Sequence, residues 1–280
     1  MRTILRLLLL FILFSILFVL PGILIPISVA VEDNSVNGAM FFLILITDFA
    51  AIMYLITRLK LFGWGLVAAT VLVFWGMQTF MTQIETWYFR EAMLRISNRE
   101  LLNLFLRPLI TAITFIPLAT LVLKKWRPSE GDYAMQIRPI TKWKEISVLS
   151  IAYMIVYFVF GYYVAWQFEE VRIFYSGSSA KLGFIEQLQH PLSTMNFLLV
   201  FQILRGLLWT MIVLPVVMYL KGNKTEKIIA SILLYSLLPS IQLVIDNPFM
   251  PESVRFAHLL EVSSSNGLFG LLFGLLMTRK

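Results

Sequence analysis

The segment "VRFAHLLEVSSSNGLFGLLFGLLM" (Val254–Met277) joins a long apolar run to a cluster of polar residues in its first half. About 20 apolar residues in a helix are enough to cross ~30 Å of hydrocarbon. Polar and ionisable groups are costly in lipid, so they face the interior of a helix bundle or a water-filled cavity. The segment therefore predicts a membrane-spanning helix with one polar face directed into the protein.

The composition extends this prediction to the whole chain. Of the 280 residues, 59% are hydrophobic and 14% are charged, whereas soluble domains are nearer half apolar and a quarter charged. The apolar runs are long and unbroken, which disagrees with the alternating ten-residue segments of a membrane β-barrel. We expect an all-α, polytopic transmembrane helix bundle in contact with the lipid bilayer.

Eight apolar stretches have the length of a membrane span. No connecting loop is long enough for a soluble domain, so we expect residues 1–280 to form a single integral membrane domain. The eight stretches are Ile4–Val31, Ala39–Thr57, Leu61–Ile84, Leu101–Leu123, Ile146–Gln167, Leu192–Leu220, Ile228–Ile245 and Val254–Met277.

The distribution of basic residues predicts the orientation of the bundle. With eight spans, five basic segments fall on one side: "MRTILR", "TRLK", "KKWRPSEGDYAMQIRPITKWK", "KGNKTEK" and "TRK". The loops "VEDNSVN", "FEEVRIFYSGSS" and "DNPFMPES" on the other side are acidic or neutral. Because Lys and Arg collect in cytoplasmic loops, both termini are expected in the cytoplasm, and we expect a prokaryotic cytoplasmic (inner) membrane.

The first apolar stretch has an alternative interpretation. A basic start, an apolar run and a small-x-small pattern at Ser28 and Ala30 are also typical of a secretory signal peptide. Cleavage there would leave seven spans and a first residue outside the cell. The sequence leaves both alternatives open.

The composition also excludes several kinds of chemistry. The chain has no cysteine and only two histidines, which excludes thiolate catalysis and a site built from three histidines. No Gly-rich nucleotide loop is present, so an ATPase within this chain is excluded. The net charge of +7 follows from the basic inner loops, so no nucleic acid partner is expected. His258 and Glu261 have no third ligand motif beside them, so no metal site is expected. The sequence does not identify a cofactor.

The last helix supplies the centre of the predicted site. His258 and Glu261 follow at i and i+3 and share one face, with Asn266 at its edge. A carboxylate beside a histidine can orient the imidazole for proton transfer. On roughly the opposite side lies a seam of small residues, which lets a neighbouring helix approach closely. This seam is Gly267, Gly270 and Gly274.

Other spans place polar residues in the same outer half of the membrane. Arg205 lies near mid-membrane and requires an acidic partner, for which depth ranks Glu261 first and Glu85 second. Asp48, near the middle of the second span, is the main exception to the outer clustering. The remaining candidates on the other spans are Gln202, Gln242, Asp246 and Arg107.

Three functions remain open from the sequence. The first is an outward-facing site for a small anionic, zwitterionic or lipid-like substrate, with possible transport. The second is a membrane-embedded hydrolase or transferase acting on a lipid or peptide by His/Glu acid–base chemistry. The third is an accessory subunit whose polar groups only hold the bundle together. The candidate catalytic residues are His258, Glu261 and Arg205, and the candidate substrate-binding residues are Glu85, Gln202, Gln242, Asp246, Asn266 and Arg107.

Overall fold

A computed structural model describes residues 2–26, 37–90, 96–132, 141–195, 197–246 and 249–279. Within these residues, eight helical stretches are long and apolar enough to cross a membrane. The prediction of an all-α polytopic bundle is therefore confirmed, and the chain is an integral membrane protein. The possible cleavage site at Ser28 and Ala30 lies outside the described residues.

The chain divides into two compact units. Unit 1 comprises Met1–Pro139 and Leu214–Asn223, and unit 2 comprises Ile140–Val213 and Lys224–Lys280. That the whole chain forms one integral domain stays a prediction.

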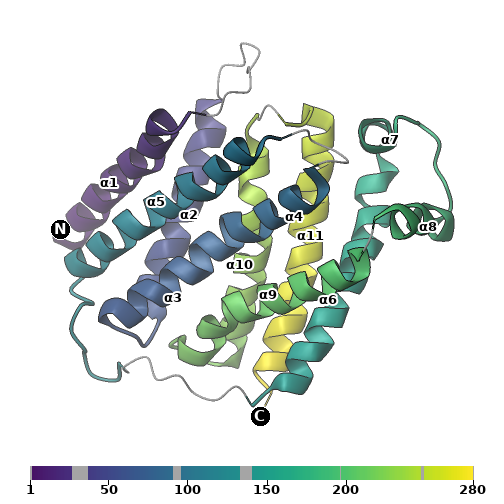
Figure 1. The fold of residues 1–280 in the computed structure, drawn as a ribbon. Coiled ribbons are helices and arrows are strands. Elements are labelled where there is room, and N and C mark those ends of the chain that lie inside the picture. The colour runs from purple at the N-terminus through teal and green to yellow at the C-terminus, as the bar shows by residue number, and fades with distance from the viewer. Residues whose placement is uncertain are drawn as a thin grey trace. The chain divides into compact units, whose positions relative to one another are not determined.

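Unit 1 is built from the first four spans (Figure 1). Helices α1 and α3 both pack against α5. The third span is a continuous helix in which a five-residue π-helical segment separates the α-helices α3 and α4. The elements are α1 (Arg2–Leu24), α2 (Gly38–Arg58), α3 (Gly63–Trp75), η1 (Gly76–Phe80), α4 (Met81–Phe89) and α5 (Asn98–Val122).

Capping residues set where two of these helices begin. The Asn37 side chain accepts hydrogen bonds from the backbone of Ala39 and Met40 at the start of α2. Ser97 and Glu100 form a reciprocal capping box that starts α5 three residues before the predicted Leu101. Such boxes satisfy backbone N–H groups that the first helical turn leaves without a partner.

Basic segments that are distant in sequence meet at one end of unit 1. Asp132 pairs with Lys125 at 2.9 Å and with Lys221 at 3.2 Å, and its side chain has no exposed surface. Leu59 and Leu220 form an isolated β-bridge. The turn after the second span, the loop after the fourth and the loop after the sixth therefore share one side, as the charge pattern predicts. That this side is cytoplasmic stays a prediction.

The ion pairs of Asp132 predict a pH-dependent stability. Burial alone would raise the pKa of its carboxyl, but hydrogen bonds from Ser129, Lys125 and Lys221 outweigh burial and hold the pKa well below its usual value. The stabilisation is then present above the unfolded value of about 3.9 and is lost as pH falls through the lowered folded value. We expect Asp132→Asn to lower the unfolding temperature in detergent at neutral pH, and the difference from wild type to shrink in acid. Glu130→Gln, at an exposed neighbouring position, is the control; equal effects of the two changes would contradict the prediction.

Unit 2 holds the fifth, seventh and eighth spans, the sixth span as far as Val213, and two short helices between the fifth and sixth spans (Figure 1). The sixth span begins at Leu198 rather than at the predicted Leu192. The residues before it form a separate helix, α8. Phe197, with a φ of 62°, has a non-helical backbone conformation and lies between the two helices. The elements are α6 (Trp143–Tyr163), η3 (Ala165–Gln167), α7 (Glu169–Ser176), α8 (Phe184–Thr194), α9 (Leu198–Tyr219), α10 (Lys224–Ser240), η4 (Ile241–Val244) and α11 (Glu252–Met277).

Small residues allow two close helix contacts in unit 2. A Cβ at Gly270 would lie 2.8 Å from the Ser231 carbonyl oxygen of α10, and Gly267 and Gly274 face the same helix. The predicted glycine seam of the last helix is thus confirmed. A Cβ at Gly206 of α9 would lie 2.6 Å from the Ser150 carbonyl oxygen of α6.

Candidate functional site

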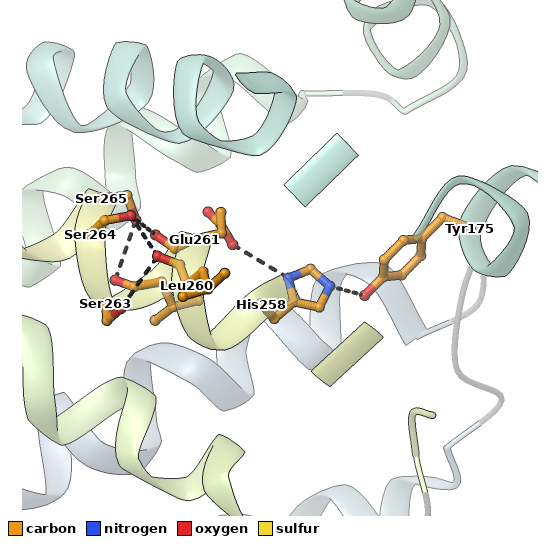
Figure 2. A network of polar contacts seen from close by, with 8 residues as sticks. Tyr175, His258, Leu260, Glu261, Ser263, Ser264 and Ser265 are labelled. Carbon is orange, nitrogen blue, oxygen red and sulfur yellow. Dashed lines mark hydrogen bonds and ion pairs between the residues drawn. The ribbon is translucent and has the colours of Figure 1, made fainter. Parts of the chain in front are cut away.

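A chain of three polar side chains joins α7 to α11 (Figure 2). The Tyr175 hydroxyl lies 2.7 Å from Nε2 of His258. On the other side of the ring, Nδ1 of His258 lies 3.4 Å from Oε2 of Glu261. The pairing of His258 with Glu261 agrees with their spacing along α11, whereas Tyr175 was not among the predicted site residues. We refer to Tyr175, His258 and Glu261 as the relay.

The relay is partly shielded from solvent. The side chains of His258 and Glu261 are 20% and 11% exposed. The Glu261 carboxylate beside Nδ1 favours the tautomer of His258 that carries its proton on Nδ1, so Nε2 can accept a hydrogen bond from the Tyr175 hydroxyl. This tautomer is assigned from the hydrogen-bond network. A proton taken up at Nε2 would make the ring a cation beside Glu261 and cancel the charge of the pair.

Arg172 holds α7 in the position that brings Tyr175 to the relay. Its guanidinium donates to the carbonyl oxygens of Ser179 at 2.8 Å, Trp166 at 2.9 Å and Gln167 at 3.0 Å. The residue is 7% exposed. Gly177, with a φ of 70°, then ends the helix.

Apolar contacts hold α7 against the first turns of α11. Val171 of α7 packs with Ala165 of η3 and with Val254 and Ala257 of α11. The ring of Trp166 stacks on Tyr175 with an interplanar angle of 16°. These contacts fix the position of the phenol ring.

A second polar group lies on α9. Arg205 is 2% exposed and donates to Oε1 of Gln202 at 3.0 Å. Its guanidinium carbon lies 5.5 Å from the ring centre of Tyr153 and 5.7 Å from that of Tyr157. Arginine over aromatic rings is stabilised by the quadrupoles of the rings. The predicted Arg205–Glu261 ion pair is not found in the described part of unit 2, where Glu261 pairs with His258.

Two buried donors on the same face of α9 have no hydrogen-bond acceptor among the described residues. They are Nε2 of Gln202 and Nε1 of Trp209, in side chains that are 0% and 1% exposed. Together with Arg205 they follow the spacing i, i+3 and i+7, which places all three on one side of the helix. An unsatisfied buried donor costs ~1–3 kcal/mol. We refer to Gln202, Arg205 and Trp209 as the donor face.

Other predicted residues in unit 2 have structural contacts. Asp246 forms an ion pair with Arg255, which also donates to the Leu243 carbonyl oxygen at 3.1 Å. This contact ties the end of η4 to the first turns of α11. Gln242 lies in η4, which packs against α11, and Asn266 is 7% exposed.

The serine run of α11 makes local hydrogen bonds. The hydroxyls of Ser263 and Ser264 donate to the Leu260 carbonyl oxygen, and that of Ser265 donates to Val262 (Figure 2). Bonds of this kind to the preceding turn are usual for serine in a helix.

Two predicted substrate-binding residues belong to unit 1. Glu85 lies on α4. Arg107 on α5 donates through Nε to the Ile25 carbonyl oxygen at 2.7 Å, at the C-terminal end of α1. A cation there balances the partial negative charge of the helix end. Their participation in a site with the unit 2 residues stays a prediction.

Comparisons of the chain with protein-family models, curated proteins and solved structures find no match. Among the described residues, no group of three or more His, Cys, Asp or Glu side chains is close enough to hold a metal ion. The fold and the buried groups define the class: a multi-pass α-helical membrane protein with charged side chains buried among its helices.

Proposed function

We propose that the protein binds a small anionic, zwitterionic or lipid-like substrate on the donor face of α9, in the half of the membrane that faces outward. The observation that carries the proposal is the pair of unsatisfied buried donors, Gln202 Nε2 and Trp209 Nε1, on either side of Arg205. A carboxylate or phosphate oxygen would accept hydrogen bonds from both donors. Hydrogen bonds to such a ligand would offset the free-energy cost of leaving the two buried donors unsatisfied.

The relay supports a coupling of this binding to proton movement. A neutral imidazole and a carboxylate side by side carry one negative charge together, and a proton bound at Nε2 of His258 would remove it. Protonation of the relay therefore makes unit 2 less negative and favours a bound anion. This is the arrangement expected of a transporter that moves an acid together with a proton.

Ligand binding is tested by replacing one unsatisfied donor. We expect Trp209→Phe to change the unfolding temperature in detergent little, because the loss of packing is offset by removal of the unsatisfied N–H. The same change should abolish stabilisation by the ligand. The ligands tested are inorganic phosphate, succinate, glycine and vesicles with anionic lipid. A ligand present at 100 times its dissociation constant should stabilise the wild-type protein by about 2.7 kcal/mol.

Trp75→Phe is the matched control for this test. The Trp75 indole donates to the Phe105 carbonyl oxygen at 3.1 Å, so its removal leaves an acceptor unsatisfied and should destabilise the protein without changing ligand stabilisation. A panel without effect on the wild-type protein, or an unchanged effect on Trp209→Phe, would count against the donor face as a binding site.

Proton coupling is tested with His258→Gln in proteoliposomes that contain a pH-sensitive dye. Glutamine keeps a hydrogen-bonding group but cannot take up a proton near neutral pH. We expect a ligand gradient to drive proton flux with the wild-type protein and a drop of about tenfold or more with His258→Gln, while ligand stabilisation in detergent persists. Full proton flux with His258→Gln would rule out the relay as its carrier.

A second candidate function is favoured by the order of groups in the relay. Hydroxyl, imidazole and carboxylate follow one another as nucleophile, general base and orienting acid do in hydrolases. In a lipid or peptide transferase, Tyr175 Oη would attack the acyl or phosphoryl group while His258 takes the phenol proton and returns it to the leaving group. An aryl sulfonyl fluoride that labels Tyr175 in the wild-type protein, but not in His258→Gln, would favour this candidate.

A further inference from the structure

Helix α8 has one apolar side and one polar side. With successive residues about 100° apart around the helix, its apolar residues fall within an arc of ~120°. They are Phe184, Ile185, Leu188, Pro191 and Leu192. The described side chains outside this arc are those of Glu186, Gln187, Gln189 and Ser193. An apolar stripe about 100° wide or wider is typical of a helix that covers an apolar surface.

Part of the apolar side packs on the end of α6. The ring centre of Phe184 lies 5.2 Å from that of Tyr162 and 5.6 Å from that of Tyr163. Just before α8, the Leu182 carbonyl oxygen accepts a hydrogen bond from the Tyr162 hydroxyl at 2.8 Å. These contacts attach the first turn of α8 to the end of the fifth span, which α6 and η3 form over Trp143–Gln167.

The other end of α8 leads directly into a membrane span. Helix α8 ends at Thr194, and the sixth span begins at Leu198. The four Cα–Cα steps between these two residues reach at most about 14 Å. Both ends of this 11-residue helix, which is ~16 Å long, are therefore tied to the ends of membrane-spanning helices. The helix thus runs along the boundary at which the two spans leave the hydrocarbon.

The rest of the apolar side is exposed. Ile185 is 62% exposed, and Leu192 is exposed on the same side of the helix. Phe197 and Val200, where α9 begins, are exposed as well. Because α9 crosses the membrane, exposed apolar residues of its first turn face lipid. The exposed side of α8 continues this lipid-facing surface beyond the end of the span.

The charges of α8 indicate which part of the bilayer it contacts. Interfacial helices that are attracted to anionic headgroups are rich in Lys and Arg on their polar face. Helix α8 contains neither residue. Lys181, which precedes the helix, donates to Oε1 of Gln167. The apolar side chains are therefore the main source of any attachment of α8 to the membrane.

We propose that α8 lies in the surface of the bilayer. Its exposed apolar residues, Ile185 and Leu192, enter the boundary between headgroups and acyl chains, and its Ser193 side faces water. The partner is the apolar part of the lipid itself and not an anionic headgroup, a second copy of the chain or another protein. This interaction surface does not depend on the function proposed for the relay and the donor face.

Spin labels on single cysteines in proteoliposomes test this proposal, because the chain has no cysteine of its own. Oxygen concentrates among acyl chains, whereas a polar nickel chelate stays in water. We expect the ratio of relaxation by oxygen to relaxation by nickel to be several-fold higher for labels at Ile185→Cys and Leu192→Cys than at Ser193→Cys. Ser193 is the matched control, an exposed residue on the polar side of the same helix. Ile155→Cys, at an exposed position of α6 within the fifth span, gives the value for lipid.

The composition of the vesicles separates the two parts of the bilayer. Vesicles of phosphatidylcholine, with or without added phosphatidylglycerol, should give the same ratio at Ile185→Cys, because α8 has no Lys or Arg. A lipid contact that forms only with phosphatidylglycerol would contradict the proposal, since headgroup charge would then hold the helix.

Two other outcomes of the labelling would overturn the proposal. Ratios at Ile185→Cys and Leu192→Cys as low as at Ser193→Cys would mean that α8 lies in water. Labels at the two apolar positions that neither reagent reaches would mean that a second copy or another protein covers this side of the helix.

Ile185→Glu gives an independent reading of the same contact. A carboxylate is costly among acyl chains, so the variant should draw α8 away from the bilayer. We expect the amide hydrogens of α8 to exchange several-fold faster in Ile185→Glu than in Ser193→Glu, measured in proteoliposomes. Equal exchange in the two variants would count against membrane contact at Ile185.

Discussion

Gly206→Ala is expected to lower the folded yield of the protein several-fold, and Gly206→Leu to abolish folding. The Cβ of alanine would lie 2.6 Å from the Ser150 carbonyl oxygen and 2.8 Å from Cβ of Tyr153. These are backbone and near-backbone atoms of α6, which cannot rotate away as the end of a flexible side chain can. The two helices would have to separate.

Separation of α9 from α6 has a cost beyond the direct clash. Overpacking a close contact typically destabilises a protein by ~1–3 kcal/mol, and every 1.4 kcal/mol changes the folded-to-unfolded ratio about tenfold. The neighbouring Arg205 would also move away from the rings of Tyr153 and Tyr157. A buried arginine that loses these contacts becomes more costly in the membrane.

Thermal unfolding in detergent measures this effect, with Gly161→Ala as the matched control. Gly161 is also in a helix of unit 2, and a Cβ there would have no atom within 4 Å. Alanine has a higher helix propensity than glycine, so the control should be neutral or slightly stabilising. Equal unfolding temperatures for the two variants would show that α6 and α9 are not in the close contact described.

Periodicity explains which helix contacts could be predicted from the sequence. Gly267, Gly270 and Gly274 repeat at helical spacing, so their packing seam is visible before the structure is known. Gly206 stands alone between Arg205 and Leu207, and a lone glycine carries no information about the partner that approaches it. The eight spans could also be predicted, because a hydrophobic run, like the glycine repeat, is a pattern within one continuous stretch of sequence.

The same distinction between local and long-range contacts applies to the candidate site. His258 and Glu261 belong to one helix, so their spacing predicts that they meet. Tyr175 lies 83 residues before His258 on a short helix placed by long-range contacts, and no local pattern identifies it. The Arg205–Glu261 pair was predicted from depth alone, which says nothing about the direction in which a side chain leaves its helix. In the structure the guanidinium lies near the rings of Tyr153 and Tyr157.

Arg172→Lys is expected to release α7 and to disconnect Tyr175 from His258. The guanidinium of Arg172 donates to three carbonyl oxygens in fixed positions, those of Trp166, Gln167 and Ser179. Lysine keeps the charge but concentrates its donors at one atom, which cannot reach all three. Hydrogen bonds from charged groups contribute roughly 1.5–3 kcal/mol each. We expect amide hydrogens of α7 to exchange at least about tenfold faster in the variant, with the other helices of unit 2 unchanged.

Glu170→Gln is the control for this local effect, because Glu170 is an exposed residue of the same helix. The consequence for the relay is read from the ¹⁵N spectrum of His258 in a His190→Gln background, where it is the only histidine of the chain. Loss of the hydrogen bond from Tyr175 should shift Nε2 in Arg172→Lys as it does in Tyr175→Phe, and the double variant should shift it no further. If Arg172→Lys frees α7 but leaves the Nε2 signal in place, then Tyr175 is held at His258 by its stacking on Trp166 and not by the position of the helix. A role for Arg172 in positioning the relay would then be wrong, although its role in folding α7 would stand.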